Sequence, residues 1–161
     1  MKKRGFEKVS KEQWVKDCFS TYFKGYYDEI KKPERATIYS AGYDIFAPKG
    51  FILQGKDDIK IPTGIKAYMQ PDEYLRIEMR SSLGFKYYIR PANVCPIIDS
   101  DYYNNEDNEG HIWLKLRNEG NKALNIKQGE AICQAIFQKY LLADGDSFEG
   151  DERKGGIGST G

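Results

Sequence analysis

The chain has few of the residues that usually mark a disulfide scaffold or a metal centre. Its three cysteines are an odd number without C-x-x-C spacing, and His111 is its single histidine. This pattern disfavours a disulfide framework and a zinc site and indicates reduced thiols in a cytosol. The chain also lacks a signal-peptide core and any apolar run of about 18 residues. We therefore expect an intracellular protein without a membrane span.

Neither sign of charge is in excess, because 25 lysines and arginines stand against 24 aspartates and glutamates, for a formal net charge of +1. A protein dedicated to nucleic acid usually carries a basic excess, so no nucleic-acid partner is expected. An anionic ligand would have to be held by a few placed cations and backbone amides. The length of 161 residues predicts one domain with a sizeable core.

Residues 1–29 predict a helical extension. Ser10 and Gln13 have capping-box spacing, and apolar residues recur at helical intervals until Gly25. A short helix is therefore expected over residues 10–24, with its apolar stripe packed against the rest of the protein.

Short strands are expected throughout residues 30–142. Runs rich in Ile, Tyr, Val and Leu are separated by turn signals, and apolar and polar residues alternate clearly over residues 74–79 and 112–117. Many short strands at this spacing predict an all-β barrel or sandwich. Residues 104–109 have a turn-forming composition that predicts an extended hairpin. His111, just beyond them, is expected to be solvated at a strand end and not catalytic.

The last segment, residues 143–161, is polar and glycine-rich. Such a segment cannot bury enough apolar area to order itself, so we expect a flexible arm. It is either a frayed terminus or an arm whose amides wrap a phosphate chain when ligand is present. Composition leaves both interpretations open.

Single residues give only weak functional signals. Asp99 directly follows an apolar run, and partial desolvation there would make it a stronger base. Tyr102 offers a flat face to a sugar or base. Gln134 lies within another apolar run, where a hydrogen bond in the core is the ordinary explanation. Asp44 alone is a common turn former, and Arg80 with its neighbouring serines suits either an oxyanion or a plain loop.

Five segments taken together resemble, in order, the five motifs of the trimeric dUTPase family. They are Ala41–Asp44, Arg80–Gly84, Ile98–Tyr102, Gly129–Gln134 and Arg153–Gly161. The resemblance extends from Pro33 to the C-terminus, and the residues after Tyr102 look like members from Gram-positive bacteria and their phages. It implies a β-barrel or distorted jelly roll, and a homotrimer in which each of three sites is built from all three chains.

The activity implied by the resemblance is hydrolysis of dUTP to dUMP and pyrophosphate with Mg²⁺. Asp99 would be the general base for the water that attacks the α-phosphate. Asp44 would hold waters of the Mg²⁺ shell, while the triphosphate supplies most metal ligands. Tyr102 would stack under the deoxyribose. The other implied substrate-binding residues are Arg80, Ser81, Ser82, Asn93, Ile98, Gln134, Arg153, Gly156, Ile157, Ser159 and Thr160.

The same resemblance implies a cytoplasmic enzyme that keeps uracil out of DNA and supplies dUMP for thymidylate synthesis. In a phage-encoded protein this would be the host cytoplasm. Two departures from the family pattern concern the base. Ile157 stands where most relatives have an aromatic lid, so Tyr103 or Trp113 could cover the uracil instead. Pro96 stands where glycine is usual, and proline fixes φ and removes an amide donor in the hairpin that reads uracil.

Two other functions stay open at this point. A dCTP deaminase shares the fold and the Arg-Ser-Ser-Leu motif, but it needs a glutamate where this chain has Lys115. A catalytically weakened dUTPase-fold protein could instead serve as a regulatory partner-binding protein, using the N-terminal helix and the 104–109 segment as its surface. The regulatory and enzymatic roles could coexist.

Overall fold

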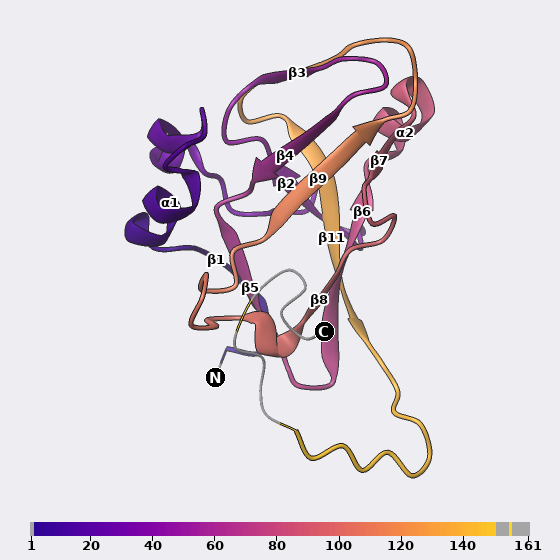
Figure 1. Ribbon diagram of the computed structural model, residues 1–161. Helices are drawn as coiled ribbons and strands as arrows, with labels where there is room; N and C mark the ends of the chain where they lie inside the picture. Colours follow the sequence, from indigo (N-terminus) through magenta and orange to yellow (C-terminus); the bar gives the residue numbers. More distant parts are fainter. Residues whose placement is uncertain (1, 151–154, 156–161) are drawn as a thin grey trace.

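The computed structural model describes residues 2–150 and Gly155, and short strands make up most of its regular structure (Figure 1). The helices are α1 (Lys11–Cys18) and α2 (Ser81–Tyr87), and the 3₁₀ turns are η1 (Lys24–Glu29) and η2 (Ser100–Tyr102). The strands are β1 (Gly5–Lys8), β2 (Tyr43–Phe46), β3 (Phe51–Leu53), β4 (Asp58–Pro62), β5 (Ile65–Tyr68), β6 (Glu73–Met79), β7 (Ile89–Pro91), β8 (Ile97–Asp99), β9 (Trp113–Asn118), β10 (Leu124–Ile126) and β11 (Ala131–Lys139). In this described part, neither helix has the length and apolar character needed to cross a membrane.

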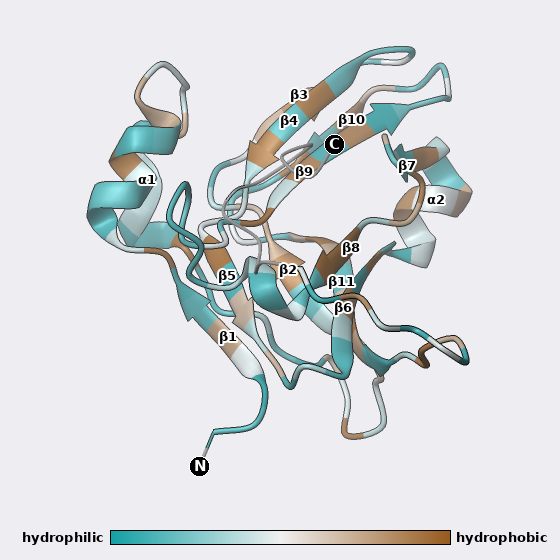
Figure 2. Ribbon diagram, turned by 60° about the horizontal axis from the view of Figure 1, so that its bottom comes forward, coloured by the Kyte–Doolittle hydropathy of each residue, from teal (hydrophilic) through white to brown (hydrophobic). Residues whose placement is uncertain are grey.

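The strands form antiparallel sheets in two layers. One layer is the sheet β2-β11-β6-β8 and the other contains the sheet β4-β9-β7, with the pairs β1-β5 and β10-β3 beside them. In both ribbon views the β4-β9-β7 sheet lies opposite the β2-β11-β6-β8 sheet (Figures 1 and 2). The predicted all-β, jelly-roll type of barrel is confirmed.

The core lies between these layers and follows from the alternation along the strands. On β6, Leu75 and Ile77 are wholly buried while their neighbours are half-buried, and on β9 buried Leu114 and Leu116 flank the exposed Lys115. Successive side chains of a strand point to opposite faces, so each strand supplies one apolar row to the interior. Figure 2 shows these rows as brown bands on the strands. The polar rows remain available for the surface and the site.

The N-terminal extension differs in part from the prediction. The Ser10 hydroxyl accepts a hydrogen bond from the Gln13 amide at 3.0 Å, so the predicted cap of α1 is confirmed. The helix ends at Cys18 and not at residue 24, and Gly25 lies inside η1. Phe23, which directly precedes η1, is still buried, although it lies beyond the end of the helix. The strand β1, which pairs with β5, was not predicted.

The segment after Tyr102 corrects two expectations. Residues 104–110 form a compact loop and not an extended hairpin, because the side-chain oxygen of Asn105 accepts from the amides of Asp107 and Asn108, both at 3.1 Å. Asx turns of this kind give the backbone an alternative to strand pairing. His111 is wholly buried, so the expected solvated position is wrong.

Candidate active site

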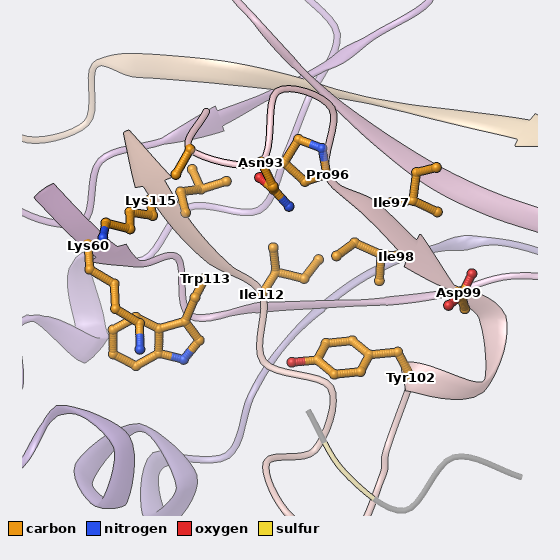
Figure 3. Close-up of a pocket in the computed structure, with 12 residues that line it drawn as sticks. Lys60, Asn93, Pro96, Ile97, Ile98, Asp99, Tyr102, Ile112, Trp113 and Lys115 are labelled. Atoms are coloured by element: carbon orange, nitrogen blue, oxygen red, sulfur yellow. The ribbon is translucent and has the colours of Figure 1, made fainter. Parts of the chain in front are cut away.

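The larger cleft has a volume of about 570 Å³ and lies where the hairpin after β7, strand β8 and turn η2 face the start of β9 (Figure 3). Its lining residues are Lys60, Ala92, Asn93, Pro96, Ile97, Ile98, Asp99, Tyr102, Ile112, Trp113, Leu114 and Lys115. Most of them are apolar, and the rings of Tyr102 and Trp113 offer flat surfaces that suit a base or sugar. A few polar groups at the ends could then orient such a ligand.

Four residues predicted from the sequence come together in this cleft: Asn93, Ile98, Asp99 and Tyr102. Figure 3 shows Asp99 at one end and Trp113 at the other, with Ile98 and Tyr102 between them. Asp99 is exposed in this chain, so the partial desolvation expected from the preceding apolar run is not observed. The cleft therefore combines an apolar, aromatic middle with an accessible carboxylate at one end.

The hairpin that forms one wall accommodates the unusual Pro96. Its turn closes through a hydrogen bond from the Val94 amide to the Pro91 carbonyl at 3.1 Å, with Val94 at φ 60°. Pro96 lacks an amide donor, but its carbonyl accepts from the Ile77 amide of β6 at 2.9 Å. Strand β8 then continues the pairing, with Asp99 opposite Tyr74. The proline is thus compatible with the wall that carries Asn93 and Asp99.

A second, smaller cleft of about 270 Å³ collects the other predicted residues of the described chain. It is lined by Ala36, Ser40, Gly42, Asp44, Arg80, Ser81, Ser82 and Gln134. Asp44 on β2 lies opposite Gln134 on β11, and the guanidinium of Arg80 is 3.6 Å from the Asp44 carboxylate. Hydroxyls, an amide and a guanidinium around one carboxylate suit an oxyanion together with a hydrated cation.

The residue before Gln134 on β11 belongs to the core and does not line the cleft. Cys133 is wholly buried beside Gln134, and burial, followed by the nearby charge of Asp44, raises the pKa of its thiol far above the usual range. The thiol therefore stays protonated and behaves as a small apolar side chain. Among residues 2–150 and 155, no group of three His, Cys, Asp or Glu side chains could hold a metal ion by itself.

The two clefts have no lining residue in common. Residues of the two clefts pair with different positions of β6. Gln134 pairs with Glu78 and Asp99 pairs with Tyr74, so the two are offset by four residues along this strand. Four residues along a strand correspond to about 13 Å. The predicted residues thus form two groups in one chain and not a single site. Arg153, Gly156, Ile157, Ser159 and Thr160, also predicted, lie outside the described residues.

Sequence reasoning missed several lining residues of both clefts, among them Lys60, Ser40 and Ala36. They belong to no recognised segment, and the fold alone brings them there. Of the two aromatic candidates for covering a base, Trp113 lines the larger cleft, with the Lys60 ammonium 4.4 Å from its ring centre. The hydroxyl of Tyr103 instead donates to Glu7 at 2.7 Å.

Comparison with known proteins gives consistent matches. A family model described as dUTPase matches residues 28–161. A deoxyuridine 5'-triphosphate nucleotidohydrolase of Lactococcus lactis is 42% identical over 162 residues, which cover 100% of this chain and 99% of that protein. The crystal structure of a dUTPase from Streptococcus mutans has a TM-score of 0.70 and 35% identity, covering 88% of this chain and 99% of that one.

A dUTPase from phage phi11 of Staphylococcus aureus has a TM-score of 0.67 at 15% identity and covers 94% of this chain and 99% of its own. That likeness concerns the fold. Together, the fold, the two clefts and the matches define an enzyme of the nucleotide-hydrolysing class. The chain belongs to the dUTPase family.

Proposed function

We propose that this protein hydrolyses dUTP to dUMP and pyrophosphate with Mg²⁺, which keeps uracil out of DNA and supplies dUMP for thymidylate synthesis. The observation that carries the proposal is the larger cleft, where Asn93, Ile98 and Tyr102 surround a space for a nucleoside and Asp99 stands at its end. Backbone groups of the Asn93–Asp99 hairpin would read the uracil, and the Tyr102 ring would lie under the sugar. Close packing there would reject a 2′-hydroxyl by steric exclusion.

Asp99 is assigned the role of general base. It lies at the end of β8, and its exposure leaves room for a water molecule between the carboxylate and a phosphorus atom. The carboxylate would orient this water and accept its proton during attack on the α-phosphate. A positioned base must be within hydrogen-bond reach of the proton that it removes, and an accessible carboxylate beside the sugar pocket satisfies this requirement.

The smaller cleft is assigned to the phosphate chain. Ser81, Ser82 and Gln134 would donate to phosphate oxygens, and Arg80 would support the cleft through its ion pair with Asp44. Asp44 fits an indirect role with Mg²⁺, because a single carboxylate can hold the waters of a cation whose other ligands are phosphate oxygens. When bound, Mg²⁺ supplies neutralisation of the phosphate charge.

Separation of the two clefts supports a homotrimer with sites shared between chains. The residues that would bind the nucleoside and those that would bind the phosphate chain line two clefts of one chain that share no lining residue. The larger cleft of one chain would therefore face the smaller cleft of another. Arg153, Gly156, Ile157, Ser159 and Thr160 would close over the bound nucleotide; the family match that includes them supports this role.

Subunit complementation tests the shared site. Asp99→Asn and Gln134→Ala each impair one cleft, so each variant alone should be nearly inactive. If a site takes its clefts from two chains, co-refolding the two variants creates some sites that are intact and restores dUTP turnover. Co-refolded samples that stay as inactive as the separate variants would show that both groups act within one chain.

The chemical step is tested with Asp99→Asn alone. This variant should bind dUTP and assemble as the parent does, while kcat falls by at least about 100-fold, the usual scale for a positioned general base. Pyrophosphate release with Mg²⁺ measures kcat, and binding of a non-hydrolysable dUTP analogue with an imido bridge measures affinity. Turnover of dUTP at the parental rate would contradict the role given to Asp99.

The chain lacks the glutamate that the alternative function, dCTP deamination, requires. Lys115 occupies the strand position where a glutamate would be needed, and its ammonium cannot accept the protons that deamination moves. Incubation with dCTP should release no ammonia. A regulatory protein partner is compatible with dUTP hydrolysis, since Phe19 and Tyr22 are exposed on the N-terminal extension, away from the residues that line the clefts.

A further inference from the structure

Residues 1–27 of the N-terminal extension precede the segment 28–161 that matches the family model, yet they are bonded to a loop beside the nucleotide cleft. Strand β1 pairs with β5, and its Glu7 carboxylate accepts from the hydroxyl of Tyr103 at 2.7 Å. Tyr103 directly follows Tyr102, which lines the cleft. The extension thus reaches the segment that carries the aromatic wall.

Helix α1 contacts the same loop at its two ends. At its start, the amide and hydroxyl of Ser10 donate to the Glu109 carboxylate at 3.0 and 2.5 Å. Near its end, the Lys16 ammonium donates to the Asp107 carbonyl at 2.7 Å. The residue that caps the helix is therefore also bonded to the loop, so helix and loop are held in one relative position.

A buried histidine connects the helix with the end of the loop. His111 is wholly buried, and its Nδ1 lies 2.6 Å from the Asp17 carboxylate of α1. Its Nε2 accepts from the Gly64 amide at 2.9 Å, so Nδ1 carries the proton and donates to Asp17. Removing the Asp17 acceptor would leave a buried N–H without its partner, which is costly.

The loop in turn holds Tyr102 at its side-chain hydroxyl and at its backbone carbonyl. The Tyr102 hydroxyl donates to the His111 carbonyl at 3.0 Å and accepts from the Asn108 amide group at 2.8 Å. The amide group of Asn105 donates to the Tyr102 carbonyl at 2.8 Å. Figure 3 shows the Tyr102 ring below Ile98 and Ile112, along the cleft. These bonds restrain the tip of the ring and the backbone that carries it.

We propose that residues 5–18 are an accessory part of the nucleotide site, in which Asp17, His111 and Asn108 act as positioning residues that hold Tyr102 for the selection of deoxyribose over ribose. The proposal rests on the proposed function, because it takes the sugar of a nucleotide to lie on Tyr102. Selection by close packing depends on a wall that does not yield. A wall that moves by about 1 Å admits an added hydroxyl, so loosening the ring raises acceptance of UTP relative to dUTP.

Four full-length variants test this coupling. Asp17→Ala removes the acceptor of His111, whereas Asp17→Asn keeps an oxygen that can accept the same proton. Asn108→Asp keeps the oxygen that accepts from Asn105 and Gly110 but replaces the donor to the Tyr102 hydroxyl. Asp28→Ala is the matched control, an exposed aspartate of the same extension.

The first measurement is the ratio of kcat/KM for dUTP to that for UTP. Asp17→Ala and Asn108→Asp should lower this ratio about tenfold, the scale expected for one lost buried hydrogen bond, whereas Asp17→Asn and Asp28→Ala should keep it. A purely structural role would lower the melting temperature or the amount of active enzyme and leave the ratio unchanged. An unchanged ratio in both Asp17→Ala and Asn108→Asp overturns the proposal.

A second measurement needs neither ligand nor turnover. Amide hydrogen exchange over residues 100–112 should be faster in Asp17→Ala than in Asp28→Ala, because release of α1 loosens the loop that holds Tyr102. Equal exchange in this segment would show that the helix does not brace the loop, and the proposal would fail. If the parent did not hydrolyse dUTP, the proposed function would fail instead, and hydrogen exchange would still decide the coupling.

Discussion

Gly42 offers a sharp test of the smaller cleft, because it has no room for a side chain. A Cβ atom at this position would lie 2.4 Å from Oε1 of Gln134 and 3.0 Å from its Cβ and Cδ. Carbon and oxygen atoms in ordinary contact are farther apart, so the Gln134 amide would have to move by about 1 Å. The backbone of Gly42 is not left-handed, so alanine is tolerated there and the fold should persist.

The expected loss follows from the hydrogen bond that the displaced amide would no longer make. A hydrogen bond to a charged group contributes about 1.5–3 kcal/mol. Gly42→Ala should therefore lower kcat/KM for dUTP by about 10- to 150-fold, because each 1.4 kcal/mol corresponds to a factor of about ten. The melting temperature should change little, since the displaced side chain is half-buried at the cleft and not in the core.

A double-mutant cycle separates this cause from general damage. The four proteins are the parent, Gly42→Ala, Gln134→Ala and the double variant, each assayed for pyrophosphate release with Mg²⁺. If the new methyl group acts only by displacing Gln134, the double variant should be about as active as Gln134→Ala. Losses that simply add, or a Gly42→Ala protein with parental kcat/KM, would refute the assignment of Gln134 to the phosphate chain.

Two further predictions concern the Glu73 carboxyl and the three cysteine thiols. Hydrogen bonds from Arg4 outweigh burial and lower the pKa of the Glu73 carboxyl. The ionised Glu73 therefore contributes fully to the free energy of unfolding above about pH 4.5, the pKa of an unfolded glutamate. This contribution is lost as the pH falls through the lower pKa of the folded state. Acid unfolding followed by circular dichroism should therefore show a shallower loss of stability in Glu73→Gln than in the parent. In the native protein, half-exposed Cys95 should react with a thiol reagent well before buried Cys18 and Cys133, and bound nucleotide should slow it, because Cys95 lies in the hairpin that lines the larger cleft. Equal reaction rates for the three thiols would contradict this accessibility.

Local sequence patterns predicted the elements whose stability is local. The alternation along β6 and β9 was enough to identify both strands, because one face of each is buried. The helix cap at Ser10 could likewise be predicted from the sequence, since its hydrogen-bond partner lies three residues away. The site residues were predicted differently, from the resemblance of five ordered segments to a known family, and those within the described part of the chain lie in two clefts.

The features that were missed depend on partners far along the chain. Strand β1 exists because it pairs with β5, about sixty residues later, and nothing in Gly5–Lys8 alone indicates such a partner. His111 is buried because Asp17 and Gly64 satisfy both ring nitrogens. A polar residue after a glycine is expected at the surface unless these partners are known. The turns of the loop after Tyr102 are local to Asn105, but the position of the loop depends on distant partners, since Ser10 and Lys16 bond to it.

The buried polar contacts of the extension also bear on its role. A core built only for stability could replace the Asp17–His111 pair with apolar side chains of similar volume, which often stabilises a protein as well or better. Hydrogen bonds differ from apolar packing because they specify direction and distance. Here they fix the loop whose other bonds end on the Tyr102 hydroxyl, the atom at the tip of the ring that lines the cleft. Selection between substrates that differ by one oxygen atom needs that kind of fixed geometry, and burial of apolar area alone does not provide it.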